Sequence, residues 1–172
     1  MGSKLSYKEQ LKCIVQISLA FMMIFTAFKP LENVMTKLYE DMGHSDFGEI
    51  SLAILYFCFA FSTAFTSSVI NSIGFKLTFI CAAFFFLCFD ASGFVIAEYT
   101  TTTFEAWVVL ILASVMGGVA NSFIWIAQGM YVGQFTTLQY RDEMFGIFWG
   151  IRNIGSVMGY VLTTFLLGQA GL

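Results

Sequence analysis

The sequence has 172 residues, of which 58% are hydrophobic and 11% charged, and its mean hydropathy is +0.80. About a quarter of the residues in an ordinary soluble domain are charged, so this composition excludes a water-soluble enzyme and a disordered regulator. The net charge of −3 provides no basic surface for a phosphate backbone, which excludes a nucleic-acid-binding module. We therefore predict a membrane protein, whose length is best counted in helical spans.

Long apolar stretches between charged residues predict where the spans lie. Each stretch can cross about 30 Å of hydrocarbon at 1.5 Å per residue. The stretches are continuous rather than alternating apolar and polar, which favours helices over a barrel. We expect an all-α membrane protein with a single multi-span domain over residues 1–172. Its five transmembrane helices are predicted at about 11–29 with a helical extension to 40, 50–73, 77–97, 107–132 and 145–167.

Basic residues near the span ends predict the orientation. With the N-terminus on the cytoplasmic side, or on the equivalent side of an organelle, most of them lie there: Lys4, Lys8, Lys12, Lys76 and Arg141. Only Lys29 and Lys37 are basic near the connections on the opposite side, an asymmetry that the positive-inside rule predicts, and those connections are mainly acidic. No small-residue cleavage site follows the first apolar stretch, so we interpret it as a retained span. The plasma membrane, an endomembrane and the mitochondrial inner membrane all remain open.

The sequence contains no catalytic signature. His44 is the only histidine, and no partners at metal-ligand or catalytic-triad spacing accompany it. The four cysteines lie in apolar stretches without a C-x-x-C pair, where a cysteine behaves as a small apolar side chain. We expect no catalytic residue, no cofactor and no metal site, and hence no enzymatic activity.

Polar residues within the predicted helices are candidates for lining a cavity. Lys29, Glu32 and Asn33 begin a polar stripe on a helix that continues past the single proline. This stripe belongs either to an amphipathic extension lying on the membrane surface or to the wall of a water-filled cavity. Asn121 and Gln128 are seven residues apart in the fourth span and face the same way. Buried amides in lipid bond across helices, or else they line a cavity.

Asp90 and Arg152 are charges well inside the third and fifth predicted spans. A charge at the bilayer centre costs at least ~2.5–3.5 kcal/mol, so each side chain requires a partner or a wet cavity. An Asp90–Arg152 ion pair is one hypothesis. Separate satisfaction of each charge by hydroxyls or carbonyls is the alternative, and a proton-relay role for Asp90 is a third.

The ion-pair hypothesis predicts a charge-reversal rescue. Asp90→Asn and Arg152→Gln each leave one charge unpaired, so each is expected to lower the Tm of the purified protein in detergent. Reversing both charges, with Asp90→Arg and Arg152→Asp together, is expected to recover that loss. A double-reversal variant whose loss of Tm equals the sum of the two single losses would contradict pairing.

Glycines in the fifth predicted span are spaced for close helix packing. Gly146 with Gly150, and Gly155 with Gly159, each follow the four-residue spacing that lets helices approach. Two such faces predict a helix sandwiched between neighbours. The start Met-Gly-Ser-Lys-Leu-Ser fits the myristoylation pattern, which makes Gly2 a candidate lipidation site.

Five segments, in order along the chain, resemble motifs of one known family. They are FMMIFTAFKPLENVMTKL at 21–38, SLAILY at 51–56, IGFKLT at 73–78, WIAQGMY at 125–131 and GIFWGI at 146–151. Each is similar to the corresponding helix or link in the uncoordinated-93 family, the ion-channel-regulatory-type members of the major facilitator superfamily.

The resemblance implies a facilitator fold, in which two six-helix halves enclose a ligand site. It also implies roles in regulating potassium channels or in trafficking membrane receptors. The sequence departs from the family by ending after the fifth predicted helix. It also departs by carrying Lys29, Glu32, Lys37 and Arg152 where largely uncharged residues are expected. Facilitators transport by rocking one half against the other, so we expect that a second copy or another chain completes these five helices, or that transport has been abandoned.

We therefore expect most of the N-terminal half of a facilitator-like fold, acting as a non-enzymatic accessory or regulatory subunit within a larger membrane-protein complex. The alternative is a half-unit of a secondary transporter or ion pathway. The expected partners are membrane lipids and other membrane subunits, in a hetero-complex or, as the second choice, a homodimer, without nucleic acid.

Overall fold

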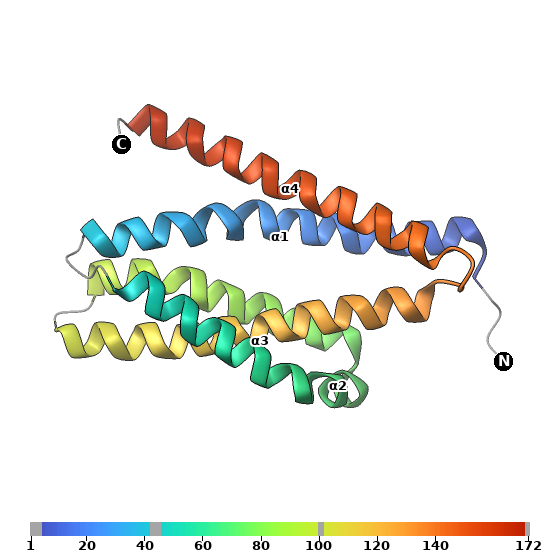
Figure 1. Ribbon diagram of the computed structural model, residues 1–172, viewed down its shortest axis with the longest axis horizontal. Helices are drawn as coiled ribbons and strands as arrows, with labels where there is room; N and C mark the ends of the chain where they lie inside the picture. The colour runs from blue at the N-terminus through green and yellow to red at the C-terminus, as the bar shows by residue number, and fades with distance from the viewer. Residues whose placement is uncertain (1–4, 42–45, 100–101, 171–172) are drawn as a thin grey trace. The chain divides into compact units, whose positions relative to one another are not determined.

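The computed structural model describes residues 5–41, 46–99 and 102–170, without the side chains of 29–38, 40–41 and 166–170. The regular structure in these ranges is entirely helical, which confirms the expected all-helical class. Its helices are α1 Tyr7–Asp41, α2 Phe47–Tyr99, α3 Thr103–Phe135 and α4 Arg141–Ala170 (Figure 1). Among the described residues, three helices are long and apolar enough to cross a membrane: Tyr7–Phe28, Phe47–Tyr99 and Thr103–Phe135.

The chain divides into two compact units. The terminal unit contains Met1–Asn33 and Gly129–Leu172, and the central unit contains Val34–Gln128. Helices α1 and α3 therefore contribute residues to both. Each unit has its own core and is described separately.

Helix α2 is interrupted at Gly74. The φ of 78° and ψ of 165° at this residue lie outside the helical region, in a conformation that glycine alone adopts readily. The hydroxyl of Thr78, buried in the following turn, donates to the Gly74 carbonyl at 2.9 Å. Helix α2 thus consists of two arms, 47–73 and 75–99, which correspond to the helices predicted at 50–73 and 77–97.

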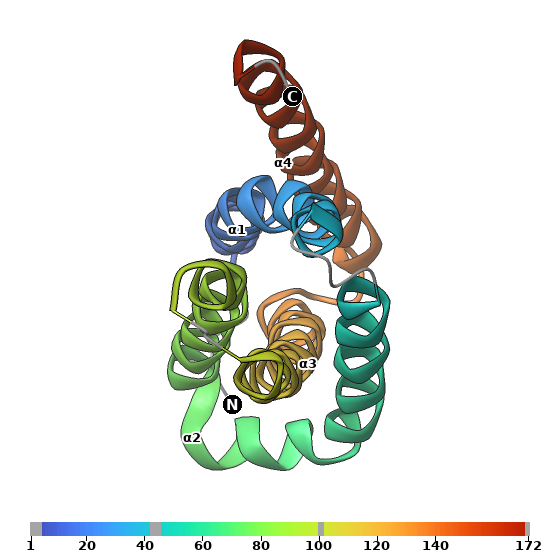
Figure 2. The ribbon, with the colours of Figure 1, turned by 90° about the vertical axis from the view of Figure 1, so that its left-hand side faces the viewer.

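In the central unit, α3 lies between the two arms of α2 (Figure 2). A Cβ added at Gly118 would lie 2.6 Å from the Cβ of Cys58 on the first arm. One added at Gly117 would lie 3.0 Å from the ring of Phe89 on the second arm. The glycine pair therefore allows α3 to contact both arms at the same level. The sequence shows that Gly117 and Gly118 are adjacent, but only the structure shows that one contacts the first arm of α2 and the other the second arm.

Small hydroxyl side chains lie inside the central unit. Ser51 and Ser114 form a hydrogen bond of 2.8 Å between the first arm of α2 and α3, and Thr66 bonds Ser122 across the same interface. These side chains are buried, whereas many of the large aromatic residues of α2 point outward; Phe57, for example, is 74% exposed. A water-soluble fold has the opposite distribution. This one fits a surrounding of lipid, in which apolar side chains need no cover and polar groups need partners.

In the terminal unit, the first part of α1 packs along α4 (Figure 1). The buried rings of Phe21 and Phe148 meet edge to face, with 5.0 Å between their centroids. One turn further along α1, the Thr26 hydroxyl lies 3.0 Å from the Gly155 carbonyl. An aromatic contact and a close backbone approach thus join the two helices.

Replacing Gly74 tests the break in α2. Gly74→Ala meets no atom within 4 Å, so its cost comes from the backbone conformation alone. We expect a loss of ~1–3 kcal/mol in unfolding free energy, seen as a lower Tm in detergent. Gly129→Ala is the matched control, because this helical glycine also has open space and helical alanine is favoured over glycine. An unchanged Tm for Gly74→Ala would contradict the strained turn.

Candidate functional site

The predicted polar residues of the central unit occupy different environments. Asn121 is buried, and its side-chain amide donates to the Gly117 carbonyl of its own helix at 3.0 Å, rather than across helices. Gln128 is 4% exposed, and its Nε2 has no hydrogen-bond partner among the described residues. Asp90, on the second arm of α2, is half-buried, and no hydrogen bond or ion pair from the described residues of the central unit reaches its carboxyl. Asp90 and Gln128 therefore remain candidates for polar lining.

Arg152, in the terminal unit, is surrounded by aromatic rings. Its guanidinium carbon lies 4.2 Å from the ring centroid of Phe25 on α1 and 5.7 Å from that of Trp149 on α4. Its Nη1 donates to the Asn153 side chain at 2.7 Å. Ring faces attract a cation more strongly where water is scarce, so these contacts help to hold the charge within the helix pair. Asp90 belongs to the other unit, and the proposed pairing stays a prediction.

Several predicted residues lie outside the description. The backbones of Lys29, Glu32 and Asn33 lie in α1, but their side chains are not among the described ones. Gly2 lies outside the described residues altogether. Their predicted roles, including both interpretations of the polar stripe, stay predictions.

The two glycine faces of α4 differ in their surroundings. Gly155 and Gly159 are buried, and a Cβ at Gly155 would lie 2.9 Å from the backbone Cα of Met22 on α1. Gly146 and Gly150 are exposed, with no atom within 4 Å of an added Cβ. One face of α4 is thus already occupied by α1 at Gly155, while the other presents small residues to its surroundings.

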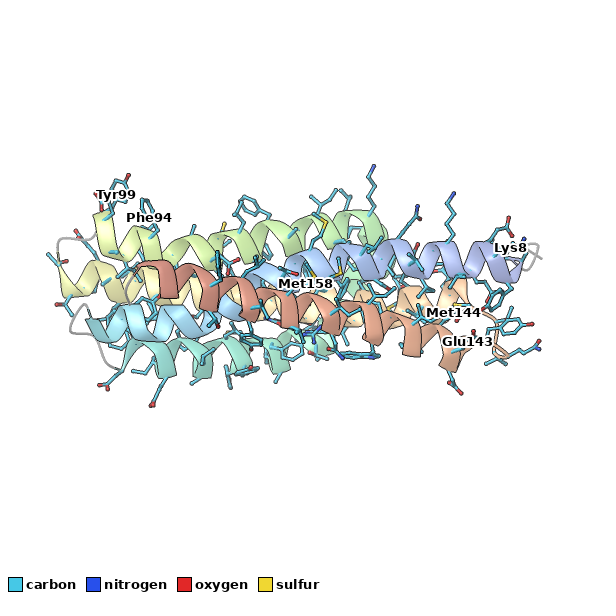
Figure 3. All side chains as sticks on the ribbon, turned by 90° about the horizontal axis from the view of Figure 1, so that it is seen from above. Lys8, Phe94, Tyr99, Glu143, Met144 and Met158 are labelled. Atoms are coloured by element: carbon cyan, nitrogen blue, oxygen red, sulfur yellow. The ribbon has the colours of Figure 1, made fainter. Side chains whose placement is uncertain are left out.

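A set of contacts that the sequence did not predict joins the start of α1 to the connection between α3 and α4 and to the first turn of α4. The Tyr7 hydroxyl donates to Glu143 Oε1 at 2.7 Å, and the Tyr7 ring packs edge to face on Tyr140 at 5.0 Å. Gln10 is 1% exposed; its Oε1 accepts from the Thr137 backbone N–H at 2.9 Å. Figure 3 shows the first turn of α1, marked by Lys8, at the same end as Glu143. We call these contacts the clasp.

Beside the clasp lies a cleft of about 800 Å³. Its walls are Leu5, Tyr7 and Gln10 from the N-terminal segment, and residues 134–141 from the end of α3, the following connection and the first residue of α4. The sequence gives one local signal for this region: Ser6 and Glu9 form a capping box, with the Ser6 N–H donating to the Glu9 carboxylate at 2.8 Å. That motif predicts where α1 starts, but not which distant residues meet it.

Substitution within α4 tests the difference between its two glycine faces. Gly155→Ala forces a Cβ against the backbone of Met22, and overpacking of this kind typically costs ~1–3 kcal/mol of stability. We expect a clear fall in Tm in detergent. Gly150→Ala, on the same helix, has open space and is expected to leave the Tm unchanged or slightly higher. Equal effects of the two substitutions would contradict the close contact between α1 and α4.

Comparison with known families identifies similar proteins. The family model described as "Ion channel regulatory protein UNC-93" matches residues 42–172. No solved structure matches the chain.

Curated relatives match over most of the chain. "Protein unc-93 homolog A" of Bos taurus is 28% identical over 170 residues, which cover 92% of this chain and 35% of that protein. "Putative potassium channel regulatory protein unc-93" of Caenorhabditis elegans is 32% identical over 161 residues, covering 87% and 21%. "UNC93-like protein 3" of Arabidopsis thaliana is 26% identical over 161 residues, covering 88% and 32%. The chain thus spans about a third or less of the length of these relatives.

Proposed function

Because the chain belongs to the UNC-93 family of ion channel regulatory proteins, we propose that it works as an accessory subunit packed within a larger membrane-protein complex. The family membership and the three apolar helices make it an integral membrane protein. The family is one of regulators, which supports a role that involves no catalysed reaction. The C. elegans relative is named for potassium channel regulation, so a channel is the first partner to test.

The proposed topology has five spans, equivalent to most of the N-terminal half of a facilitator-like fold. Helix α2 has 53 residues, or roughly 80 Å at 1.5 Å per residue, far more than about 30 Å of hydrocarbon requires. Each arm beside Gly74 has roughly 25 residues, which is enough for one crossing. With α1, α3 and α4, the arms supply the helices proposed at about 11–29 with an extension to 40, 50–73, 77–97, 107–132 and 145–167.

The open glycine face of α4 is the observation that supports a subunit role best. Gly146 and Gly150 have no atom within 4 Å of an added Cβ, and Trp149 between them is 43% exposed. Small residues in a membrane helix allow a second helix to approach closely, and dispersion contacts then hold the pair. An aromatic residue beside such a face adds a large contact area. We propose that a helix of the partner subunit packs here.

Native-size analysis tests this docking face. The chain, extracted from its own membrane in mild detergent, is expected to migrate in a particle larger than itself. Gly146→Leu with Gly150→Leu should release it as a smaller particle while its own Tm is kept, because both positions face open space. Val157→Leu with Val161→Leu, on exposed positions of the same helix, is the matched control and should leave the particle intact. A double-leucine variant that stays in the large particle would contradict the proposal.

The second candidate function, a half-unit of a transporter or ion pathway, is supported by polar groups inside the central unit. The buried Gln128 Nε2 has no partner among the described residues, and Asp90 adds a carboxyl within the second arm of α2. Polar residues at membrane depth commonly mark ion or substrate paths. This function would be favoured over the accessory role if the chain forms a discrete homodimer whose Tm rises with an added solute. Gln128→Leu should then reduce that solute-dependent rise.

A further inference from the structure

The cleft beside the clasp has walls of defined chemistry, and neither the family nor the proposed subunit role accounts for it. Its volume of about 800 Å³ exceeds what a few water molecules need. Gln10 stabilises its inner wall from both ends: Oε1 accepts from Thr137, and Nε2 donates to the Leu5 carbonyl at 2.8 Å. The wall is therefore fixed before any ligand arrives, which lowers the entropic cost of binding.

The charge of the lining favours an anion. Among the lining residues, Arg141 is the only charged one, and the others are apolar or carry neutral hydroxyl and amide groups. Arg141 Nη2 donates to the Gly133 carbonyl at 3.1 Å, which fixes the side chain. Its Nε is sheltered from solvent and has no partner among the described residues. A ligand therefore reaches this half-buried guanidinium through its terminal Nη atoms, whose donors match the oxygen atoms of a phosphate.

The surroundings of the cleft favour a lipid as the source of that anion. Tyr7 and Tyr140 line it together, and tyrosines gather at the level of lipid headgroups. Leu138 lies on its wall with 82% of its surface exposed, at a position where it can contact acyl chains. Lys8 and Lys12 are exposed on the adjoining turns of α1, but Glu9, Asp142 and Glu143 on the first turns of α1 and α4 offset their charge, so the preference for an anion comes from Arg141 in the lining itself. This end of the unit lies on the side that the positive-inside rule assigns to the cytoplasm, where anionic lipids attract basic groups.

We propose that this cleft binds the phosphate-bearing headgroup of an anionic phospholipid, with the Arg141 guanidinium as its charged donor. The side-chain amides of Gln134 and Gln139, both exposed on the wall, donate to the remaining headgroup oxygens. Leu138 lies against the first part of the acyl chains. The lipid then bridges the start of α1 and the connection from α3 to α4, so it stabilises the same end of the terminal unit as the clasp.

The first experiment compares probes on the purified full chain in a neutral detergent. Phosphatidylglycerol is expected to raise the Tm in a saturable manner, whereas phosphatidylcholine and inorganic phosphate alone are expected to have little effect. An equal shift with inorganic phosphate would overturn the lipid as the source. The absence of a shift with phosphatidylglycerol would overturn the site itself.

The second experiment assigns the effect to the cleft. Arg141→Gln should raise the phosphatidylglycerol concentration that gives half of the full Tm rise by about tenfold or more, since a hydrogen bond to a charged group contributes about 1.5–3 kcal/mol. Lys76→Gln, an exposed cation of the central unit, is the matched control and should keep the full response. Each response is measured from that variant's own Tm without lipid. An unchanged response in Arg141→Gln, or an equal loss in Lys76→Gln, would contradict the assignment.

A third substitution keeps the test decisive should Arg141→Gln fail to fold. Gln139 is exposed and lines the cleft. Gln139→Glu places a negative charge beside the headgroup and is expected to weaken the response several-fold, whereas Gln139→Lys should keep or strengthen it. Equal responses of the two variants would contradict an anion in the cleft.

Discussion

The structure depends on one constraint: buried polar groups must find partners within the protein, because hydrocarbon offers none. In the central unit this constraint is met by hydroxyl pairs such as Ser51 with Ser114, located between the first arm of α2 and α3. Many aromatic residues of α2, such as Phe57 and Phe61, point the other way, where only lipid can surround them at no cost. In the terminal unit, Arg152 is held by the ring of Phe25 and the side chain of Asn153. The paired polar side chains inside the protein and the apolar side chains on its surface thus have the same cause, which is that the surrounding solvent is lipid.

Close approach of backbones makes these polar contacts geometrically feasible. A serine hydroxyl reaches only a short distance from its helix, so two serines can bond only where the helix axes are near each other. Gly117 and Gly118 bring α3 against both arms of α2, and Gly155 brings α4 against Met22 of α1. Small residues and hydroxyl pairs therefore act together, as is usual for helices packed in membranes. The exposed pair Gly146 and Gly150 has the same chemistry, but no atom of the described residues lies within 4 Å of an added Cβ, which is why we propose a partner there.

The sequence predicts the helices better than it predicts their contacts. Gaps between charged residues are a local property, and they indicated helical segments on either side of Gly74. The spacing of polar residues from Lys29 onward is also local, and it predicted a helix that runs on through the single proline, as α1 does. They did not reveal that the second and third predicted helices are joined through a single glycine instead of a loop. The clasp was missed because Gln10 and Thr137 are 127 positions apart, and neither carries a local signature. For Asn121 the sequence left open a bond across helices or the lining of a cavity; its amide donates within its own helix, an acceptor that composition does not encode.

The single-residue break at Gly74 has a mechanical consequence. A long loop between two helices would let each slide along its own axis independently. Here the second arm begins at the residue after the break, and the Thr78 hydroxyl ties its first turn to the Gly74 carbonyl. Any axial displacement of one arm must therefore be passed on to the other without slack. The backbone can still rotate about φ and ψ of Gly74. A force on either arm would therefore change the angle between the two arms.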